Sequence, residues 1–338
     1  QLDTLARWAE PTEMGPDISP AMSDKAIEEA AEKIKPHQGE IVGRIVRQLA
    51  RELRHPRDIA HGVSYRDGDL HLHRHSAPKA VPKGIPLLII DADADLATNR
   101  ILFGSNLTGR EIMARRLGRV TQVRNATLAK SYIAPEAAFS APTDRQVEHA
   151  QALRARILAW ISSRAEGGKV LVVTNKPVRT AFTGEGSGRI PVSVEFGGAT
   201  WTHYGAILGI DAWKHYDAVV LLGREEMSAG AAEQQARAIH CDDPIPLNLT
   251  GRYRKVTRCH RMRDGSAVPM QVYEHEDHRV QVCTEAKRER GMAQALDRLR
   301  LIHGCADREV FILCNLPLPG IEVDNLLTLN ELLDGGTA

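Results

Sequence analysis

The stretch HYGAILGIDAWKHYDAVVLLGR, residues 203–224, joins a loop rich in small residues to an apolar run. Glycines at positions 205 and 209 allow the backbone to approach a neighbouring group closely, and Asp211 supplies a carboxylate. Residues 218–222 are all apolar, which is typical of a strand buried on both faces of a parallel sheet. The stretch therefore predicts a loop that leads into an interior strand of an α/β fold.

The rest of the chain from about residue 111 repeats this alternation of apolar runs and helical patterns. We expect strands at 119–128, 169–174, 218–222 and 310–314, and helices at 143–164, 229–240, 279–303 and 323–333. Strands that alternate with helices form a mostly parallel sheet with helices on both faces. The predicted fold class is α/β.

One segment, residues 252–276, interrupts the alternation. Asp264 and Gly265 lie between two runs with strand character, which indicates a hairpin. Its first half is rich in arginine, and such a basic run is either a solvated hairpin face or a phosphate-contacting surface. The candidate contacts are Arg252, Arg254 and Lys255.

The first 110 residues follow a different pattern. They predict helix over 22–54 and a hairpin over 62–73 around Asp67 and Gly68. The apolar run 85–90 predicts a buried strand, and it is followed by Asp91, Asp93 and Asp95. Carboxylates that follow a buried strand would lie at the edge where open α/β sheets bind ligands.

Composition narrows the class of protein. The chain has 338 residues and a net charge of +1, so bulk charge gives no signal for nucleic acid. Its five cysteines form no CxxC pair, which fits a reducing cytoplasm better than a disulfide framework. We expect no membrane span and no signal peptide. Because the chain begins with Gln1, we also expect further motifs upstream.

A second stretch, GMAQALDRLRLIHG at residues 291–304, adds candidate chemistry. Gln294 and Arg298 are four residues apart and would project from one side of a helix, whereas Arg300 would point about 200° away from Arg298 on a regular helix. The segment from Gln294 to Arg300 resembles motif VI of superfamily 1 and 2 helicases, with Asp297 where superfamily 2 has glycine. Residues 205–211 with the strand after them are similar to motif V of the same helicases.

This resemblance implies the carboxyl-terminal part of a P-loop helicase of the kind carried by phages, plasmids and mobile elements. The expected fold is a second RecA-like domain at 111–338 with a hairpin insert at about 252–276, preceded at 1–110 by the remnant of a first RecA-like domain. Asp91, Asp93 and Asp95 would then correspond to motif III. No GxxxxGK[ST] occurs in the chain.

The resemblance also implies site residues and partners. Arg298 would act as an arginine finger on ATP with Mg²⁺, assisted by Gln294, and Gly209, Asp211 and Arg300 would contact the nucleotide. The upstream RecA-like domain would bear Walker A and Walker B, so this chain alone should hydrolyse ATP negligibly. The segments after the predicted strands, together with the basic insert, would contact single-stranded DNA: Thr174, Asn175, Lys176, His203, Tyr204, Arg252, Arg254 and Lys255.

Two alternatives stay open. Asp91 and Asp93 could hold Mg²⁺ in a Toprim-like primase or nuclease module, or the chain could be a non-catalytic nucleic-acid-binding scaffold. His71, His73 and His75 alternate and could share one strand face, which is a possible metal site. A solvent-facing strand side explains them as well, and we predict no metal.

Overall fold

The computed structural model describes residues 36–66, 68–75, 85–91, 94–112, 114–185, 191–303 and 307–335. The chain divides into two compact units. The first unit comprises Gln1–Leu87, Ala97–Leu107 and Glu233–Leu249, and the second comprises Leu88–Leu96, Thr108–Ala232 and Thr250–Ala338. The sequence divides the chain once, near residue 110, whereas the first unit also includes a segment from beyond residue 230.

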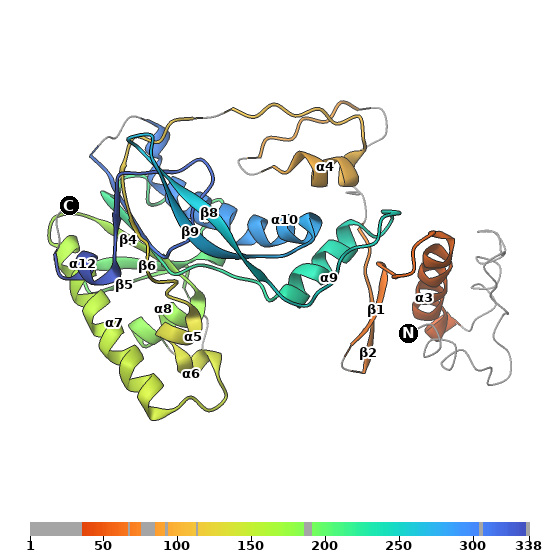
Figure 1. Cartoon of the computed structure of the whole chain (residues 1–338), viewed down its shortest axis with the longest axis horizontal. Helices are drawn as coiled ribbons and strands as arrows, with labels where there is room; N and C mark the ends of the chain where they lie inside the picture. Colours follow the sequence, from red (N-terminus) through yellow and green to blue (C-terminus); the bar gives the residue numbers. More distant parts are fainter. Residues whose placement is uncertain are drawn as a thin grey trace. The chain divides into compact units, whose positions relative to one another are not determined.

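A seven-stranded sheet forms the centre of the second unit (Figure 1). Its spatial order is β12-β3-β10-β7-β4-β6-β5. All neighbouring pairs are parallel except β5 and β6. The strands are β3 (Arg119–Val123), β4 (Val170–Thr174), β5 (Ser193–Phe196), β6 (Ala199–His203), β7 (Ala218–Leu222), β10 (Glu309–Leu313) and β12 (Asn325–Leu327). The protein is thus an α/β protein with a mostly parallel mixed sheet, as the alternation predicts.

Helices cover one face of this sheet, on the side where α7 lies in Figure 1. Helix α7 (Asp144–Ala165) begins with a capping box in which Thr143 and Gln146 bond each other's backbone N–H. It buries Leu153, Ile157 and Trp160 against the sheet. Shorter helices accompany it: α5 (Lys130–Ile133), α6 (Pro135–Ala138), α8 (Lys176–Thr183) and α12 (Leu329–Leu333).

The opposite face is covered by the loop after β6 and by the helix that contains Met292 and Leu296. Tyr204, Ile207 and Trp213 from the loop pack in one core cluster with Met292 and Leu296. The loop begins with a 3-10 turn, η1 (Tyr204–Ala206). The helices on this side are α10 (His278–Lys287) and α11 (Glu289–Leu296). The apolar strands therefore have both faces buried.

The predicted hairpin insert is confirmed. Strands β8 (Arg254–Met262) and β9 (Ala267–Glu274) pair antiparallel, and β11 (Glu322–Val323) adds a third strand beside β8. Gly265 at the turn has φ 87°, a conformation that glycine adopts readily, and Ser266 N–H donates to the Asp264 carboxylate over 2.8 Å. The local turn chemistry determines this element.

The first unit contains helix α3 (Pro36–Arg54) and the hairpin of β1 (Val63–Arg66) and β2 (Asp69–Leu72). Both agree with the sequence prediction, although residues 22–35 of the expected helix lie outside the described residues. Helix α4 (Leu96–Phe103) was not predicted. Helix α9 (Ala229–Ile239) begins in the second unit and ends in the first.

Three predicted elements are wrong. Residues 85–90 form no strand, and Leu88 and Ile90 are 81% and 89% exposed, because no neighbouring strand pairs with the run. The helix expected over 323–333 is instead β11, β12 and the short α12, since residues 322–327 join two different sheets. The helix expected over 279–303 breaks at Arg288 and again after Leu296, where the 3-10 turns η2 (Asp297–Leu299) and η3 (Leu301–His303) follow. None of the helices in the described part of the chain is both long and apolar enough to span a bilayer.

Candidate functional site

The carboxyl ends of β4 and β7 lie side by side at a point where the chain leaves the sheet in opposite directions. After β4 the chain continues to β5 and β6 on one side, and after β7 it continues to β10 on the other. Open α/β sheets bind ligands in the crevice that such a divergence creates. We call the residues at and just after the carboxyl ends of β4, β6 and β7, positions 174–176, 203–204 and 222–226, the carboxyl edge.

Three predicted residues, Thr174, Asn175 and Lys176, lie at the carboxyl end of β4. The Thr174 hydroxyl donates to Leu222 O over 2.8 Å, and the Asn175 amide donates to Arg224 O over 3.0 Å. These two hydrogen bonds connect the end of β4 to the end of β7, so both side chains have a structural role. Lys176 is exposed and is the first residue of α8, where the positive end of the helix dipole favours anions. Lys176 is therefore the group that a phosphate could reach.

His203 is the last residue of β6, the neighbour of β4 on its other side, and Tyr204 comes directly after it. His203 pairs in register with Thr174 and is half-buried. Burial lowers the pKa of its imidazole, and the charges of Arg179 and Lys176 lower it further. A neutral ring at this position can both donate and accept a hydrogen bond.

Tyr204 has a structural role. It is fully buried, and its hydroxyl donates to Gly223 O over 2.8 Å. Burial raises the pKa of this phenol well above its ordinary value. Of the predicted residues at this edge, Lys176 and His203 remain accessible, whereas Thr174, Asn175 and Tyr204 support the edge.

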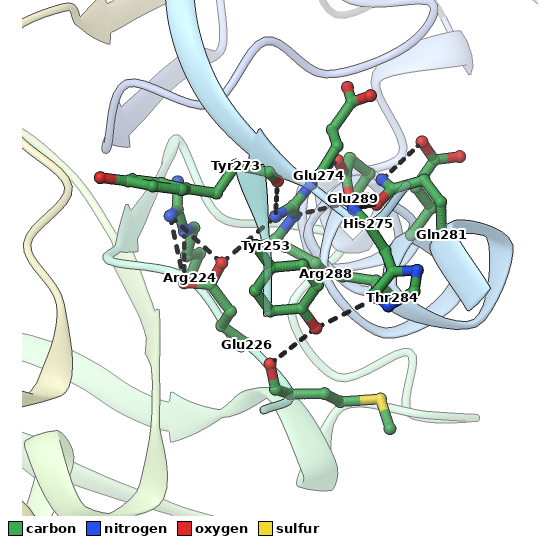
Figure 2. Close-up of polar contacts among 12 residues, drawn as sticks. Arg224, Glu226, Tyr253, Tyr273, Glu274, His275, Gln281, Thr284, Arg288 and Glu289 are labelled. Carbon is green, nitrogen blue, oxygen red and sulfur yellow. Dashed lines mark hydrogen bonds and ion pairs between the residues drawn. The ribbon is translucent and has the colours of Figure 1, made fainter. Parts of the chain in front are cut away.

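A network of arginines and glutamates lies beyond β7 (Figure 2). Arg288 is fully buried at the break between α10 and α11, where it donates to Glu289, Glu226 and Tyr273 O over 2.7, 3.2 and 2.9 Å. Arg224, which follows β7, also bonds Glu226 over 3.1 Å. The network ties the end of β7 to the helix pair and to β9.

Arg258 extends this network to the hairpin. It ion-pairs with Glu274, Glu285 and Glu289. Tyr253, one of the residues drawn in Figure 2, donates its hydroxyl to Met227 O over 2.9 Å. Because glutamates surround each of these arginines, the network is a structural support and offers little to a phosphate. No sequence pattern reveals this network, because its partners lie up to 62 residues apart.

The basic residues of the insert differ in exposure. Arg252, Arg254 and Lys255 are exposed, whereas Arg258 turns to its three glutamates. The Lys255 ammonium lies 5.9 Å from the centre of the Tyr273 ring. Arg261, near the end of β8, is exposed as well, so the accessible cations of the insert include all three that the sequence proposes for nucleic acid.

The arginines after α11 lie at the other edge of the sheet. Leu117, just before β3, donates its N–H to Leu301 O over 3.2 Å, and Arg116 forms a paired contact of 2.6–2.7 Å with Asp297. These contacts put residues 297–301 near the amino ends of the strands. A five-residue strand is about 16 Å long, so this amino edge is well separated from Lys176.

Both arginines of the helicase-like motif contact the loop after β6. Arg298 donates to Ile210 O over 3.0 Å, and Arg300 pairs with Asp211 over 2.8–2.9 Å. The expectation that the two arginines diverge by about 200° is wrong, because Arg300 adopts a left-handed conformation with φ 53° after a 3-10 turn. The hydrogen bond from Arg300 lowers the pKa of the exposed Asp211 carboxyl.

Two other predicted residues, Gly209 and Gln294, lie in the segments that Arg298 and Arg300 bring together. Gly209 has φ 71° and has no atom near the position of a Cβ, so it gives the loop its turn. Gln294 is half-buried on α11, one turn before Arg298. The structure therefore assembles the motif V-like and motif VI-like segments at the amino edge, away from the candidate nucleic-acid residues at the carboxyl edge.

The motif III-like acids do not follow a strand, because residues 85–90 form none. Asp91 is exposed, and Asp93 lies outside the described residues. Asp95 pairs with Arg290 over 3.4 Å. The Toprim alternative required two carboxylates at a strand end, and the structure removes that premise.

The alternating histidines do not form one metal-binding face. His71 and His73 stack with ring centres 6.3 Å apart, and His73 Nε2 lies 2.7 Å from Ser64 Oγ. Burial, followed by the charge of Arg237, lowers the pKa of His73 to about 4. His75 lies beyond β2 and has different neighbours.

Comparison of the chain with protein-family models, curated proteins and solved structures gives no match.

Proposed function

We propose that this chain is a RecA-like domain of an ATP-dependent helicase or translocase, which binds single-stranded DNA at its carboxyl edge. The observation that carries the proposal is the position of Lys176 and His203 at the divergence of β4 and β7. A mostly parallel sheet with helices on both faces is consistent with this assignment. Such a motor would act in the cytoplasm.

The nucleotide is assigned to the opposite edge. Arg298 and Arg300 converge on residues 209–211, which resemble the motif V loop, and Asp211 is exposed beside them. ATP and Mg²⁺ would be supplied there by a first RecA-like domain that bears the Walker A and Walker B motifs. Arg298 would exchange its bond to Ile210 O for a phosphate oxygen as charge develops on the transferred group.

The DNA assignment is tested by fluorescence anisotropy with a labelled single strand across a salt series. Lys176→Ala should weaken binding and reduce the salt slope by about 1, because one phosphate contact is lost. Lys169→Ala is the matched control, since this lysine is exposed at the other end of the same strand. Equal losses in both variants, or no binding by the wild-type chain, would contradict the carboxyl-edge site.

The motor assignment is tested by ATP hydrolysis with and without single-stranded DNA. The assay compares this chain with the natural gene product that contains it. Only the gene product should hydrolyse ATP, and Arg298→Ala should slow it by about 1000-fold, the effect of losing an arginine finger. Arg116→Ala, at the same edge, is the control and should retain activity.

The outcomes separate the alternatives. A gene product that binds DNA at the carboxyl edge without hydrolysing ATP would be a nucleic-acid-binding scaffold. Hydrolysis that persists in Arg298→Ala would exclude the finger while leaving the DNA site intact.

A further inference from the structure

A histidine, a cysteine and an aspartate meet within the first unit. One ligand atom from each of His75, Cys241 and Asp242 lies within 4.8 Å of the other two. His75 follows β2, whereas Cys241 and Asp242 follow α9, so the fold brings together residues 166 positions apart. Among the described residues, this is the cluster with the composition and spacing of a metal site.

The distances fit a zinc ion. Zn–S and Zn–N bonds of about 2.3 and 2.0 Å at a tetrahedral angle separate the sulfur and the nitrogen by about 3.5 Å. Cys241 Sγ and His75 Nδ1 are 3.4 Å apart. A zinc ion therefore fits between these two atoms with little movement of either side chain.

A fourth ligand is close by. His55 Nε2 lies 3.9 Å from Asp242 Oδ1, against about 3.4 Å for a nitrogen and an oxygen bound to one tetrahedral zinc ion. His55 is partly buried, directly after α3. His55 is not one of the residues whose ligand atoms all lie within 4.8 Å of one another, so it would have to move toward Cys241 and His75 to become a ligand.

We propose that His75, Cys241 and Asp242, with His55 as the fourth ligand, bind Zn²⁺. Thiolate and imidazole ligands select zinc over the hard cations Mg²⁺ and Ca²⁺. Binding forms a Zn–S bond and releases the Cys241 proton to solvent. His75 Nδ1, which also lies 3.3 Å from Ala238 O, exchanges that contact for the metal.

The backbone that carries Cys241 and Asp242 is held in advance. Arg57 donates to Cys241 O over 2.7 Å and also to Asp243 O. His61 accepts from Leu247 N–H at Nε2, so its Nδ1 carries the proton and donates to His240 O; both contacts are 2.9 Å. These buried side chains fix the loop from both ends, which is the support that a metal site needs.

The surroundings admit an ion. A cavity of about 330 Å³ is lined by His75, Asp242 and their neighbours His240 and Asp243, which gives a path for a hydrated cation. A cysteine–histidine nucleophile is the competing explanation. Burial raises the pKa of the Cys241 thiol even though the contact with His75 lowers it, so the pair does not activate the thiol by itself.

The test uses the purified chain and Co²⁺ as a spectroscopic substitute for Zn²⁺, with Zn²⁺ affinity measured by calorimetry. One Co²⁺ per chain should bind and give a thiolate charge-transfer band that Zn²⁺ abolishes. Cys241→Ser should remove the band and weaken Zn²⁺ binding by more than about tenfold, because even the loss of an outer partner costs that much.

Two further variants keep the test decisive. Cys259→Ser changes an exposed cysteine of the second unit and should leave the band unchanged. Asp242→Asn changes an exposed ligand, so it should weaken Zn²⁺ binding without unfolding the chain. Absence of the band in the wild-type chain, its persistence in Cys241→Ser, or unchanged affinity in Asp242→Asn would overturn the proposal. None of these ligands belongs to the seven-stranded sheet, so the result is independent of the proposed function.

Discussion

The two edges of the seven-stranded sheet carry similar charged residues in different settings. Next to the carboxyl edge, where Arg288 bonds Glu226, Arg288 and Glu289 are almost completely buried and bond each other. At the amino edge, Arg300 and Asp211 are about half exposed. A buried pair contributes strongly to the fold once formed, because breaking it leaves a charge without water, whereas an exposed pair can exchange partners at little cost. Arg288 therefore stabilises the architecture, whereas the exposed pair of Arg300 and Asp211 can rearrange.

The largest expected effect of a substitution comes from the buried pair. Arg288→Met should lower the free energy of unfolding by about 3–5 kcal/mol, because Glu289 then keeps a buried charge with only the longer contact from Arg258. Urea denaturation followed by circular dichroism measures this loss. The amino-edge control is Arg116→Met, whose partner Asp297 is 38% exposed and whose loss should cost under about 1 kcal/mol. Equal losses would show that the edges do not differ in this way.

The apolar and local signals of the sequence predict much of this fold. Strands β4, β7 and β10 are continuous apolar runs, and α7 and the β8–β9 hairpin have their own cap and turn residues. The run at 85–90 misleads because hydrophobicity alone does not supply a pairing partner. Strands β5 and β6 were missed because their polar residues hide the strand pattern.

The candidate sites could be predicted only in part. Residues that follow parallel strands must share an edge, so the neighbourhood of Lys176 and His203 follows from the strand assignments. The break at Arg288 does not, since it depends on Glu226 and Tyr273 O, which are distant in sequence. For the same reason Cys241 gives no sign of its contact with His75 until the chain is folded.

The pH dependence of stability should distinguish the buried His260 from the exposed Asp211 at the amino edge. His260 on β8 is 1% exposed, and burial lowers its pKa to about 4 although the backbone of Asn315 opposes the shift. Below about pH 6.5 the imidazole of His260 is protonated in the unfolded chain, whereas in the folded chain it stays neutral down to about pH 4. Stability should fall across this window as the pH decreases, by up to about 3 kcal/mol from this residue.

The comparison of wild type with His260→Met isolates this contribution. Denaturation at a series of pH values should show a shallower acid decline for the variant. Asp211 at the amino edge affects stability at lower pH. The hydrogen bond from Arg300 lowers the pKa of the Asp211 carboxyl, so their ion pair is lost only when the pH falls below the ordinary pKa of an aspartate. Parallel pH profiles for wild type and His260→Met would exclude the buried imidazole as the cause.

Glycines at the two edges should differ by a smaller amount. Gly223 follows β7 with φ 69°, and a Cβ there would lie 2.5 Å from the backbone oxygen of Leu128. Gly209 has a similar φ of 71° but open space around it. Gly209→Ala should therefore cost about 1–2 kcal/mol for the left-handed backbone alone, and Gly223→Ala about 1 kcal/mol more for the collision. The difference between the two denaturation midpoints measures that collision, and equal midpoints would mean that β7 can shift to relieve it.

The smallest effect on stability is expected at Arg300, the exposed counterpart of the buried Arg288. Its φ of 53° strains any residue with a Cβ, and its ion pair with Asp211 is exposed. Arg300→Gly removes both the strain and the pair, so the free energy of unfolding should change little. The loop after β6 should nevertheless exchange its amide hydrogens faster over residues 207–213, because a contact that holds Asp211 is gone. A large loss of stability would assign Arg300 a structural role like that of Arg288. Unchanged stability with faster exchange would instead explain why a strained arginine occupies this position: it orders a loop at a site where glycine would satisfy the fold.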